Sequence, residues 1–60
     1  MPVITVEMFE GRTREQRQAF AKTVTEAAVQ ILKAPLDHTW IIFRDSPKSE
    51  WAIGGKLCDE

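Results

Sequence analysis

The sequence has almost none of the residues that hold very small proteins together through covalent bonds or metals. Among its 60 residues there is one cysteine, Cys58, so no disulfide can form within the chain. The single histidine, His38, lies twenty residues from Cys58, and the two do not make a metal-ligand set. A chain this short buries only about 60% of the surface that its unfolded form exposes, so its own core is marginal. Self-association is the remaining means of stabilisation, and we expect it.

The sequence also lacks an excess of charge and a long apolar run. Eight basic and nine acidic residues give a net charge of -1, which argues against a nucleic-acid-binding surface or a polybasic membrane patch. No apolar stretch reaches the length of a membrane span, and the N-terminus lacks the blocks of a signal peptide. We therefore expect neither a nucleic acid nor a membrane as partner, and, without a disulfide framework, a cytoplasmic location.

The first half of the sequence predicts a strand and then a long helix. Residues 2–8 are rich in β-branched side chains, and the first position of a strand tolerates a proline. One face of this strand carries Ile4, Val6 and Met8, and the other carries Val3, Thr5, Glu7 and Phe9. After the turn "EGR", the stretch "TREQ" at 13–16 fits a capping box that starts a helix.

The helix is predicted to run until Pro35 stops it, because the residue before a proline is pushed out of the α region. Its apolar residues recur at spacings of three and four: Phe20, Val24, Ala27, Ala28, Ile31 and Leu32. Charged residues are expected largely on its solvated side: Arg14, Arg17, Lys22 and Glu26.

The second half of the sequence predicts another strand and a short terminal hairpin. Residues 39–44, "TWIIFR", form the strand, and a helix of about 30 Å can return the chain so that both strands run parallel. "DSPKSE" is a turn, and "WAIGGKL" is an apolar piece broken by two glycines. The prediction is one α+β domain over residues 1–60: a β-α-β unit with two parallel strands, one long helix and a short C-terminal hairpin.

Both faces of the second strand are apolar. Trp40 and Ile42 lie on one face, and Ile41 and Phe43 on the other. One helix covers only one face of a sheet, whereas a strand that is apolar on both sides usually lies between two layers. We therefore predict an obligate oligomer in which another copy covers the second face.

No single residue identifies a functional site. Pro2 is explained by its place at the start of a strand, Arg12 by a solvated turn, and Trp51 by packing at a subunit contact. His38 is a solvated residue before a strand, and Cys58 lies in a loose tail. The diglycine near the C-terminus is too short for a phosphate-binding loop.

In their order and spacing, however, these features resemble the 4-oxalocrotonate tautomerase family. The resemblance runs without a gap from Pro2 to Leu57, nearly the whole chain. It rests on the second-position proline, "EGR" at 10–12, the capped helix, "APL" at 34–36, Trp51 and "IGG" at 53–55.

The resemblance implies a tautomerase-like β-α-β subunit that pairs into dimers, with three dimers forming a homohexamer. It implies that Met1 is removed and that Pro2, then the amino-terminal residue, acts as a general base. Such enzymes move a proton between an enol or dienol hydroxyl and a carbon of a 2-oxo acid such as 2-hydroxymuconate. They use neither cofactor nor metal, and they serve the breakdown of aromatic compounds.

The resemblance also assigns roles to residues that bind the substrate. Arg12 binds a substrate carboxylate, for which a guanidinium is well shaped, and Trp51 forms part of the pocket wall. A free α-amine titrates near 7.7–8.0, and burial or a nearby cation lowers that pKa toward the working pH. Trp51, Phe9 and Ile53 could supply the apolar surroundings of Pro2, and Arg12 the positive charge.

One position departs from the family pattern. Trp40 stands where the best-studied members carry a second arginine that grips the substrate and stabilises developing negative charge. Losing such a donor costs about 10²–10³-fold in rate. Arg44 shares the strand face of Trp40 but lies about 13 Å further along it. Either Arg44 or Arg14 of another copy acts in place of the arginine, or the substrate differs, or the tautomerase activity is weak.

Two alternatives to the tautomerase hypothesis stay open at this point. In one, the same proline supports water addition to unsaturated acids or release of halide from them. In the other, the chain is a non-catalytic oligomer that binds a small apolar acid or a partner. Retention of Met1 favours the second alternative, because the Pro2 nitrogen is then an amide and cannot act as a base.

Overall fold

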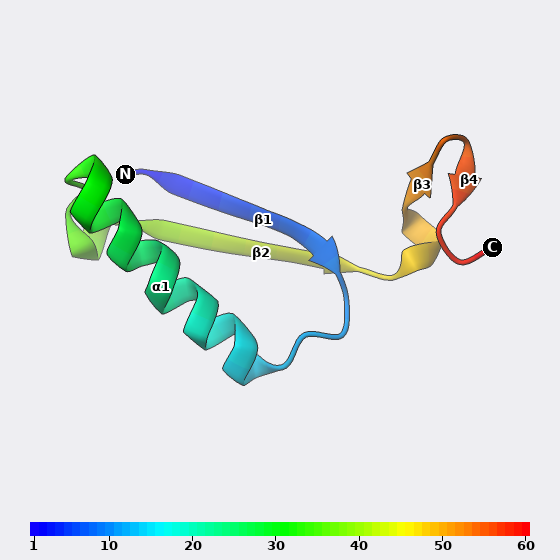
Figure 1. Ribbon diagram of the computed structural model, residues 1–60, viewed down its shortest axis with the longest axis horizontal. Helices are drawn as coiled ribbons and strands as arrows, with labels where there is room; N and C mark the ends of the chain where they lie inside the picture. Colours follow the sequence, from blue (N-terminus) through cyan, green and yellow to red (C-terminus); the bar gives the residue numbers. More distant parts are fainter.

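Two parallel strands form the centre of the protein. In the computed structural model, which describes all of residues 1–60, β1 (Val3–Phe9) pairs with β2 (Trp40–Ser46) along the full length of both (Figure 1). The two predicted strands and their parallel arrangement are confirmed. The register places Val3 opposite Trp40 and Phe9 opposite Ser46.

The strand bounds differ from the predicted ones by one or two residues at each end. Pro2 has no N–H for the ladder, but its carbonyl accepts the backbone N–H of Trp40 at 3.0 Å. β2 continues two residues past Arg44, since the Ser46 carbonyl still accepts the N–H of Glu10 at 3.0 Å. Backbone hydrogen bonds between the strands, rather than the pattern of apolar side chains, therefore determine where the strands end.

Helix α1 (Arg14–Leu32) begins at the predicted capping box. The Thr13 hydroxyl accepts the Gln16 N–H at 3.1 Å, and the Gln16 side chain accepts the Thr13 N–H at 2.9 Å. The helix ends before Pro35, because Lys33 takes the left-handed conformation (φ 59°) and its N–H donates to the Ala28 carbonyl. Pro35 instead precedes a short 3₁₀ turn, η1 (Leu36–His38).

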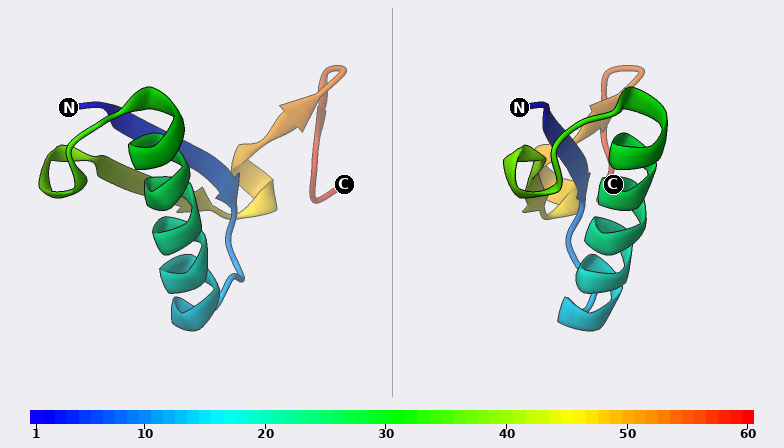
Figure 2. Two further views of the ribbon diagram at one scale, coloured as in Figure 1. Left: turned by 60° about the vertical axis from the view of Figure 1, so that its left-hand side comes forward. Right: turned by 90° about the vertical axis from the view of Figure 1, so that its left-hand side faces the viewer.

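The helix lies across one face of the two-stranded sheet and leaves the other face open (Figure 2). Only Ala28 on the helix and Ala34 after it are buried. The sheet side chains on the helix side are half-buried, as predicted from their alternation: Ile4, Val6, Met8, Ile41 and Phe43. The sheet does not cover the whole apolar side of the helix, since Ile31 stays 77% exposed.

The C-terminal part stands apart from the β-α-β unit. A turn, η2 (Lys48–Glu50), leads to the hairpin β3 (Ala52–Ile53) and β4 (Lys56–Leu57), which extends beyond the end of the sheet (Figure 1). Its two central glycines have φ of 61° and 85°, as a tight hairpin turn requires. The radius of gyration is 14.4 Å, whereas a compact chain of this length has about 10.4 Å. None of the helices combines the length and apolar character needed to cross a membrane.

Candidate active site

Pro2 and Trp40 lie side by side at the start of the two strands. The Trp40 N–H donates to the Pro2 carbonyl, and the Trp40 side chain lies on the same sheet face as that of Val3. Pro2 is half-buried, whereas Trp40 is 58% exposed. Met1 precedes Pro2 in the chain, so the Pro2 nitrogen becomes an amine only when Met1 is removed.

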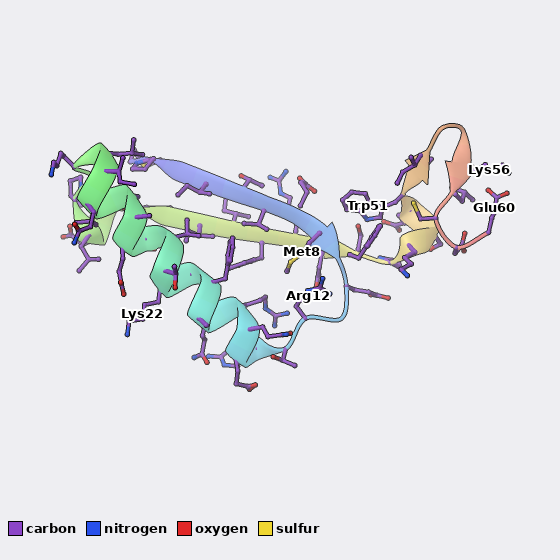
Figure 3. The ribbon with its side chains drawn as sticks, viewed as in Figure 1. Met8, Arg12, Lys22, Trp51, Lys56 and Glu60 are labelled. Atoms are coloured by element: carbon purple, nitrogen blue, oxygen red, sulfur yellow. The ribbon has the colours of Figure 1, made fainter.

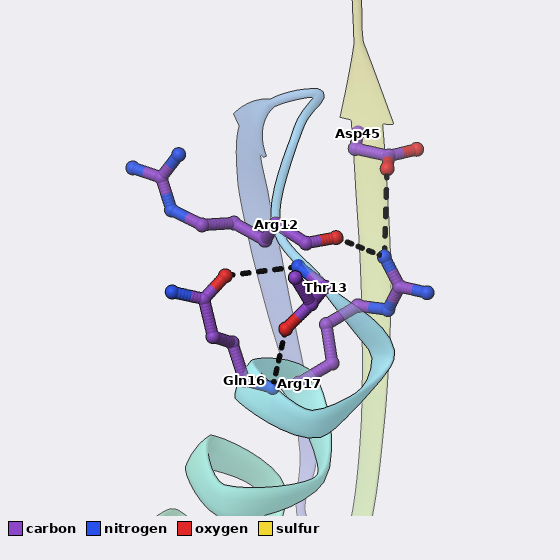
Figure 4. A network of polar contacts seen from close by, with 5 residues as sticks. All are labelled: Arg12, Thr13, Gln16, Arg17 and Asp45. Carbon is purple, nitrogen blue, oxygen red and sulfur yellow. Dashed lines mark hydrogen bonds and ion pairs between the residues drawn. The ribbon is translucent and has the colours of Figure 1, made fainter.

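Arg12 lies at the opposite end of β1, in the loop that leads into α1 (Figure 3). The loop needs Gly11, whose φ of 121° is unfavourable for other residues. The Arg12 carbonyl accepts a hydrogen bond from Nη1 of Arg17 at 3.0 Å, and the same nitrogen lies 3.9 Å from Asp45 on β2 (Figure 4). The first turn of the helix thereby fixes the backbone that carries Arg12.

The guanidinium of Arg12 points away from Arg17 and Asp45 (Figure 4). The ion pairs of the protomer use Arg17 and Arg44, so Arg12 keeps its positive charge unpaired. Arg12 also borders a cavity of about 270 Å³ between the sheet and the first half of the helix. The other residues that line this cavity are Val6, Met8, Gln16, Arg17, Phe20 and Phe43.

Trp51 forms an aromatic cluster with Phe9 near the end of the strands. The two ring centroids lie 4.8 Å apart with an edge-to-face angle of 70°. The Trp51 indole N–H donates to the Ser46 hydroxyl at 2.8 Å, and Nζ of Lys48 lies 5.7 Å from the Phe9 ring centroid. The cluster is the main side-chain link between the sheet and the segment that leads to the hairpin.

Arg44 forms an ion pair with Glu7, its neighbour in the β1–β2 register, at 3.7 Å. Both side chains are well exposed, at 64% and 59%. Arg14 is the first residue of α1 and is exposed. Neither arginine lies beside Pro2 of the same protomer, because Arg44 is four residues along β2 and Arg14 lies beyond the far end of β1.

The structure thus divides the predicted site residues into two groups within one protomer. Pro2 and Trp40 lie at one end of the sheet, Arg12, Phe9 and Trp51 lie at the other, and Arg44 lies between them, two residues before the end of β2. A strand of seven residues is about 23 Å long, so neither the charge of Arg12 nor the two aromatic rings act on Pro2 of the same protomer. A site that uses all of these residues requires more than one copy of the chain.

Arg17 is a residue whose position the sequence pattern did not indicate. It was expected largely on the solvated side of the helix, but it is half-buried and joins Asp45 to the Arg12 loop. Its spacing of seven residues from Val24 and eleven from Ala28 places it on the sheet-facing side, which is the signal that could have identified it. No group of three or more His, Cys, Asp or Glu side chains gathers as metal ligands.

Comparison with known proteins identifies the class to which this fold and these residues belong. The profile of the Tautomerase family, described as tautomerase enzyme, matches residues 2–60. The chain therefore belongs to the tautomerase family, and within it the chain is a homologue of 4-oxalocrotonate tautomerase. The family relationship predicted from the sequence is confirmed.

Particular relatives match almost end to end. A protein of Bacillus cereus named "Probable tautomerase" is 41% identical over 56 residues, 93% of this chain and 92% of its own. The crystal structure of YwhB, a homologue of 4-oxalocrotonate tautomerase, superposes with a TM-score of 0.94 at 32% identity, over 98% of this chain and 97% of that one. A heterohexameric 4-oxalocrotonate tautomerase from Chloroflexus aurantiacus matches at 30% identity and a TM-score of 0.90, over 100% and 97% of the two chains. The fold prediction, a β-α-β unit with a C-terminal hairpin, is confirmed.

Proposed function

We propose that the protein is a cofactor-free tautomerase whose general base is Pro2, freed by removal of Met1. Its substrates are the enol or dienol forms of unsaturated 2-oxo acids, such as 2-hydroxymuconate. The observation that supports this most strongly is the family relationship over residues 2–60, which begins at Pro2 itself. The cytoplasm stays a prediction for its location.

In the proposed reaction the Pro2 nitrogen takes the proton of the substrate hydroxyl. The oxygen becomes the carbonyl oxygen of the 2-oxo acid, the double bond shifts, and the proton is delivered to a substrate carbon. The base returns to its starting state, so the reaction is an isomerisation with no net gain or loss of atoms. A well-placed general base of suitable pKa contributes about 10²–10⁴-fold to such a step.

Arg12 is proposed to bind a substrate carboxylate through its unpaired guanidinium. A planar fork of N–H groups matches a carboxylate in bidentate fashion. Since Arg12 and Pro2 lie at opposite ends of β1, we assign the two residues of one site to different copies of the chain. Trp51 and Phe9, which lie at the same end of the sheet as Arg12, are proposed to form an apolar wall that shields the reacting groups from water.

The surface of the protomer supports self-association. The chain exposes 4869 Å², whereas a compact monomer of 6.8 kDa exposes about 3,950 Å². The excess of about 900 Å² is close to the roughly 800 Å² that each partner buries in an interface of standard size. Large apolar side chains on the open sheet face and on the helix contribute to it: Val3, Phe20, Ile31 and Ile42. We propose a homohexamer built as a trimer of dimers.

The experiment that tests the function is the ketonisation of 2-hydroxymuconate, followed by ultraviolet absorbance, with the wild type beside Pro2→Ala. We expect activity in the wild type and a loss of at least about 10²-fold in the variant, at an unchanged oligomer mass. An intact mass that lacks Met1 is the required control. Full activity in Pro2→Ala would overturn the mechanism. Absence of activity in both would direct the search to hydration or dehalogenation of unsaturated acids.

A further inference from the structure

Trp40 begins β2 next to the backbone of Pro2, and its side chain has neither an aromatic pair nor a hydrogen bond in its own protomer. Its backbone N–H is fixed to the Pro2 carbonyl at 3.0 Å, so the start of β2 cannot move away from Pro2 without breaking that bond. The side chain is nevertheless 58% exposed. An exposed ring on a fixed backbone is a surface that a planar ligand can contact.

Trp51, the second tryptophan of the chain, has the contacts expected of a structural residue and serves as a comparison for Trp40. Trp51 packs its ring edge-to-face against Phe9 and donates its indole N–H to Ser46. The aromatic pairs and side-chain hydrogen bonds of the protomer include Trp51 but not Trp40. The indole of Trp40 is therefore unpartnered within its own protomer.

The sheet face around Trp40 carries no charge for two residues along either strand. The register sets Val3 opposite Trp40 and Thr5 opposite Ile42. The first charges on this face are Glu7 and Arg44, which already neutralise each other at 3.7 Å. From Trp40 to Arg44 is about 13 Å along the strand, so no strand cation is available at the Pro2 end for a second substrate carboxylate.

We infer that Trp40 determines substrate specificity by selecting acids with one carboxylate and an aromatic group, over dicarboxylates. This inference rests on the proposed function and deepens it. In the enol of an arylpyruvate, the carboxylate and the aryl group lie at opposite ends of a short chain whose middle atoms exchange the proton. The carboxylate then goes to Arg12 of another copy, and the aryl ring stacks on the indole. Aromatic pairs gain stability beyond the burial of their area, whereas a carboxylate against an apolar surface loses hydration without compensation.

The test compares two enols, those of phenylpyruvate and of 2-hydroxymuconate, through the ratio of their kcat/KM values. Three variants are used: Trp40→Phe, Trp40→Arg, and Gln30→Arg, which adds the same charge to the exposed side of α1. Trp40→Phe should keep the ratio within about threefold, since a ring remains for stacking. Trp40→Arg should lower the aryl-to-dicarboxylate ratio at least about tenfold, because a guanidinium now meets the second carboxylate. Gln30→Arg should leave the ratio unchanged.

An unchanged ratio in Trp40→Arg, or an equal fall of the ratio in Gln30→Arg, would overturn the inference. The unreactive acids cinnamate and trans,trans-muconate provide a readout that does not depend on turnover. Their Kd ratio, measured by calorimetry, should shift toward muconate in Trp40→Arg. If Pro2→Ala leaves the rates unchanged while this Kd ratio shifts, the proposed function fails and the role of Trp40 holds. If activity depends on Pro2 and neither ratio shifts, the function holds and the role of Trp40 fails.

Discussion

The guanidinium of Arg44 lies 3.7 Å from the carboxylate of Glu7 on the neighbouring strand. The two residues are direct partners in the β1–β2 register, so the strand pairing itself brings them together. This pair bears on the missing second arginine of the site, because Arg44 is the cation that shares the strand face of Trp40. To grip a substrate beside Pro2, Arg44 would have to leave Glu7.

We therefore predict that Arg44→Gln lowers kcat/KM for 2-hydroxymuconate by less than about threefold. An exposed ion pair contributes only about 0.2–1 kcal/mol to stability, so the oligomer should persist as well. Steady-state kinetics beside Arg14→Gln, the same change at the other candidate arginine, measures both effects. A loss near 10²-fold in only one of the two variants would instead identify that arginine as the second substrate-binding cation.

The distance between Pro2 and Arg12 leads to a prediction about mixed oligomers. Pro2→Ala and Arg12→Ala chains should each be inactive, or nearly so, when they assemble alone. Unfolded together in equal amounts and refolded, they should regain activity, because about a quarter of the sites then combine an intact Pro2 with an intact Arg12 from different copies. The measurement is the ketonisation rate of the mixture against that of each variant refolded alone.

The control for this experiment is the double variant with both substitutions in one chain, refolded with wild type. If both residues of a site came from the same chain, the two single variants would show no recovery, whereas this mixture would keep half of its sites. Because the extended β1 strand separates Pro2 from Arg12 within one chain, we expect activity to return in the mixture of the two single variants.

The capping box at Thr13 and Gln16 supports both the helix and the loop that carries Arg12. Thr13→Ala removes the hydroxyl that accepts the Gln16 N–H, and we expect a loss of about 1 kcal/mol in the free energy of unfolding. Denaturant unfolding followed by circular dichroism measures this change. Thr23→Ala, the same substitution at an exposed position inside α1, should be neutral or slightly stabilising, because alanine favours helices more than threonine. Equal effects in the two variants would show that the cap contributes nothing.

The sequence predicted the elements of the fold well because each has a local signal. β-branched residues marked both strands, and Thr13 with Gln16 marked the start of the helix to the residue. The end of the helix was less well predicted. The helix ends at a left-handed residue, Lys33, whereas glycine is the residue that usually marks such an end in a sequence. The bounds of the strands depend on backbone ladder bonds such as that from Trp40 to Pro2, which side-chain patterns do not record.

The candidate site was harder to predict than the fold. Residues were assigned to it one by one through the family resemblance, which carries no information on which copy of the chain supplies each. The separation of Arg12 from Pro2 follows only when β1 is seen as one extended strand between them. Arg17 was missed because its charge suggested solvent, while its partner Asp45 lies 28 residues away in the sequence and reaches it only through the crossover.

The open face of the sheet provides the last prediction, which concerns assembly. Ile42 lies near the middle of that face, opposite Thr5, and is 39% exposed in the protomer. A carboxylate at this position would be hydrated in an isolated chain but buried and unpaired beneath a second copy, where a charge is costly. Ile42→Asp should therefore dissociate the oligomer while costing the isolated chain little.

Sedimentation equilibrium of wild type and Ile42→Asp, with Gln30→Asp as the charge-matched control, measures this effect. The wild type and Gln30→Asp should sediment as the same multiple of 6.8 kDa, and Ile42→Asp as a smaller species. Because the chain buries only two of its 60 residues by itself, the smaller species should also unfold at a lower temperature than the wild type. An Ile42→Asp protein with the wild-type mass would mean that copies associate through the helix, which exposes the large apolar side chains of Phe20, Ile31 and Leu32, and not through the sheet.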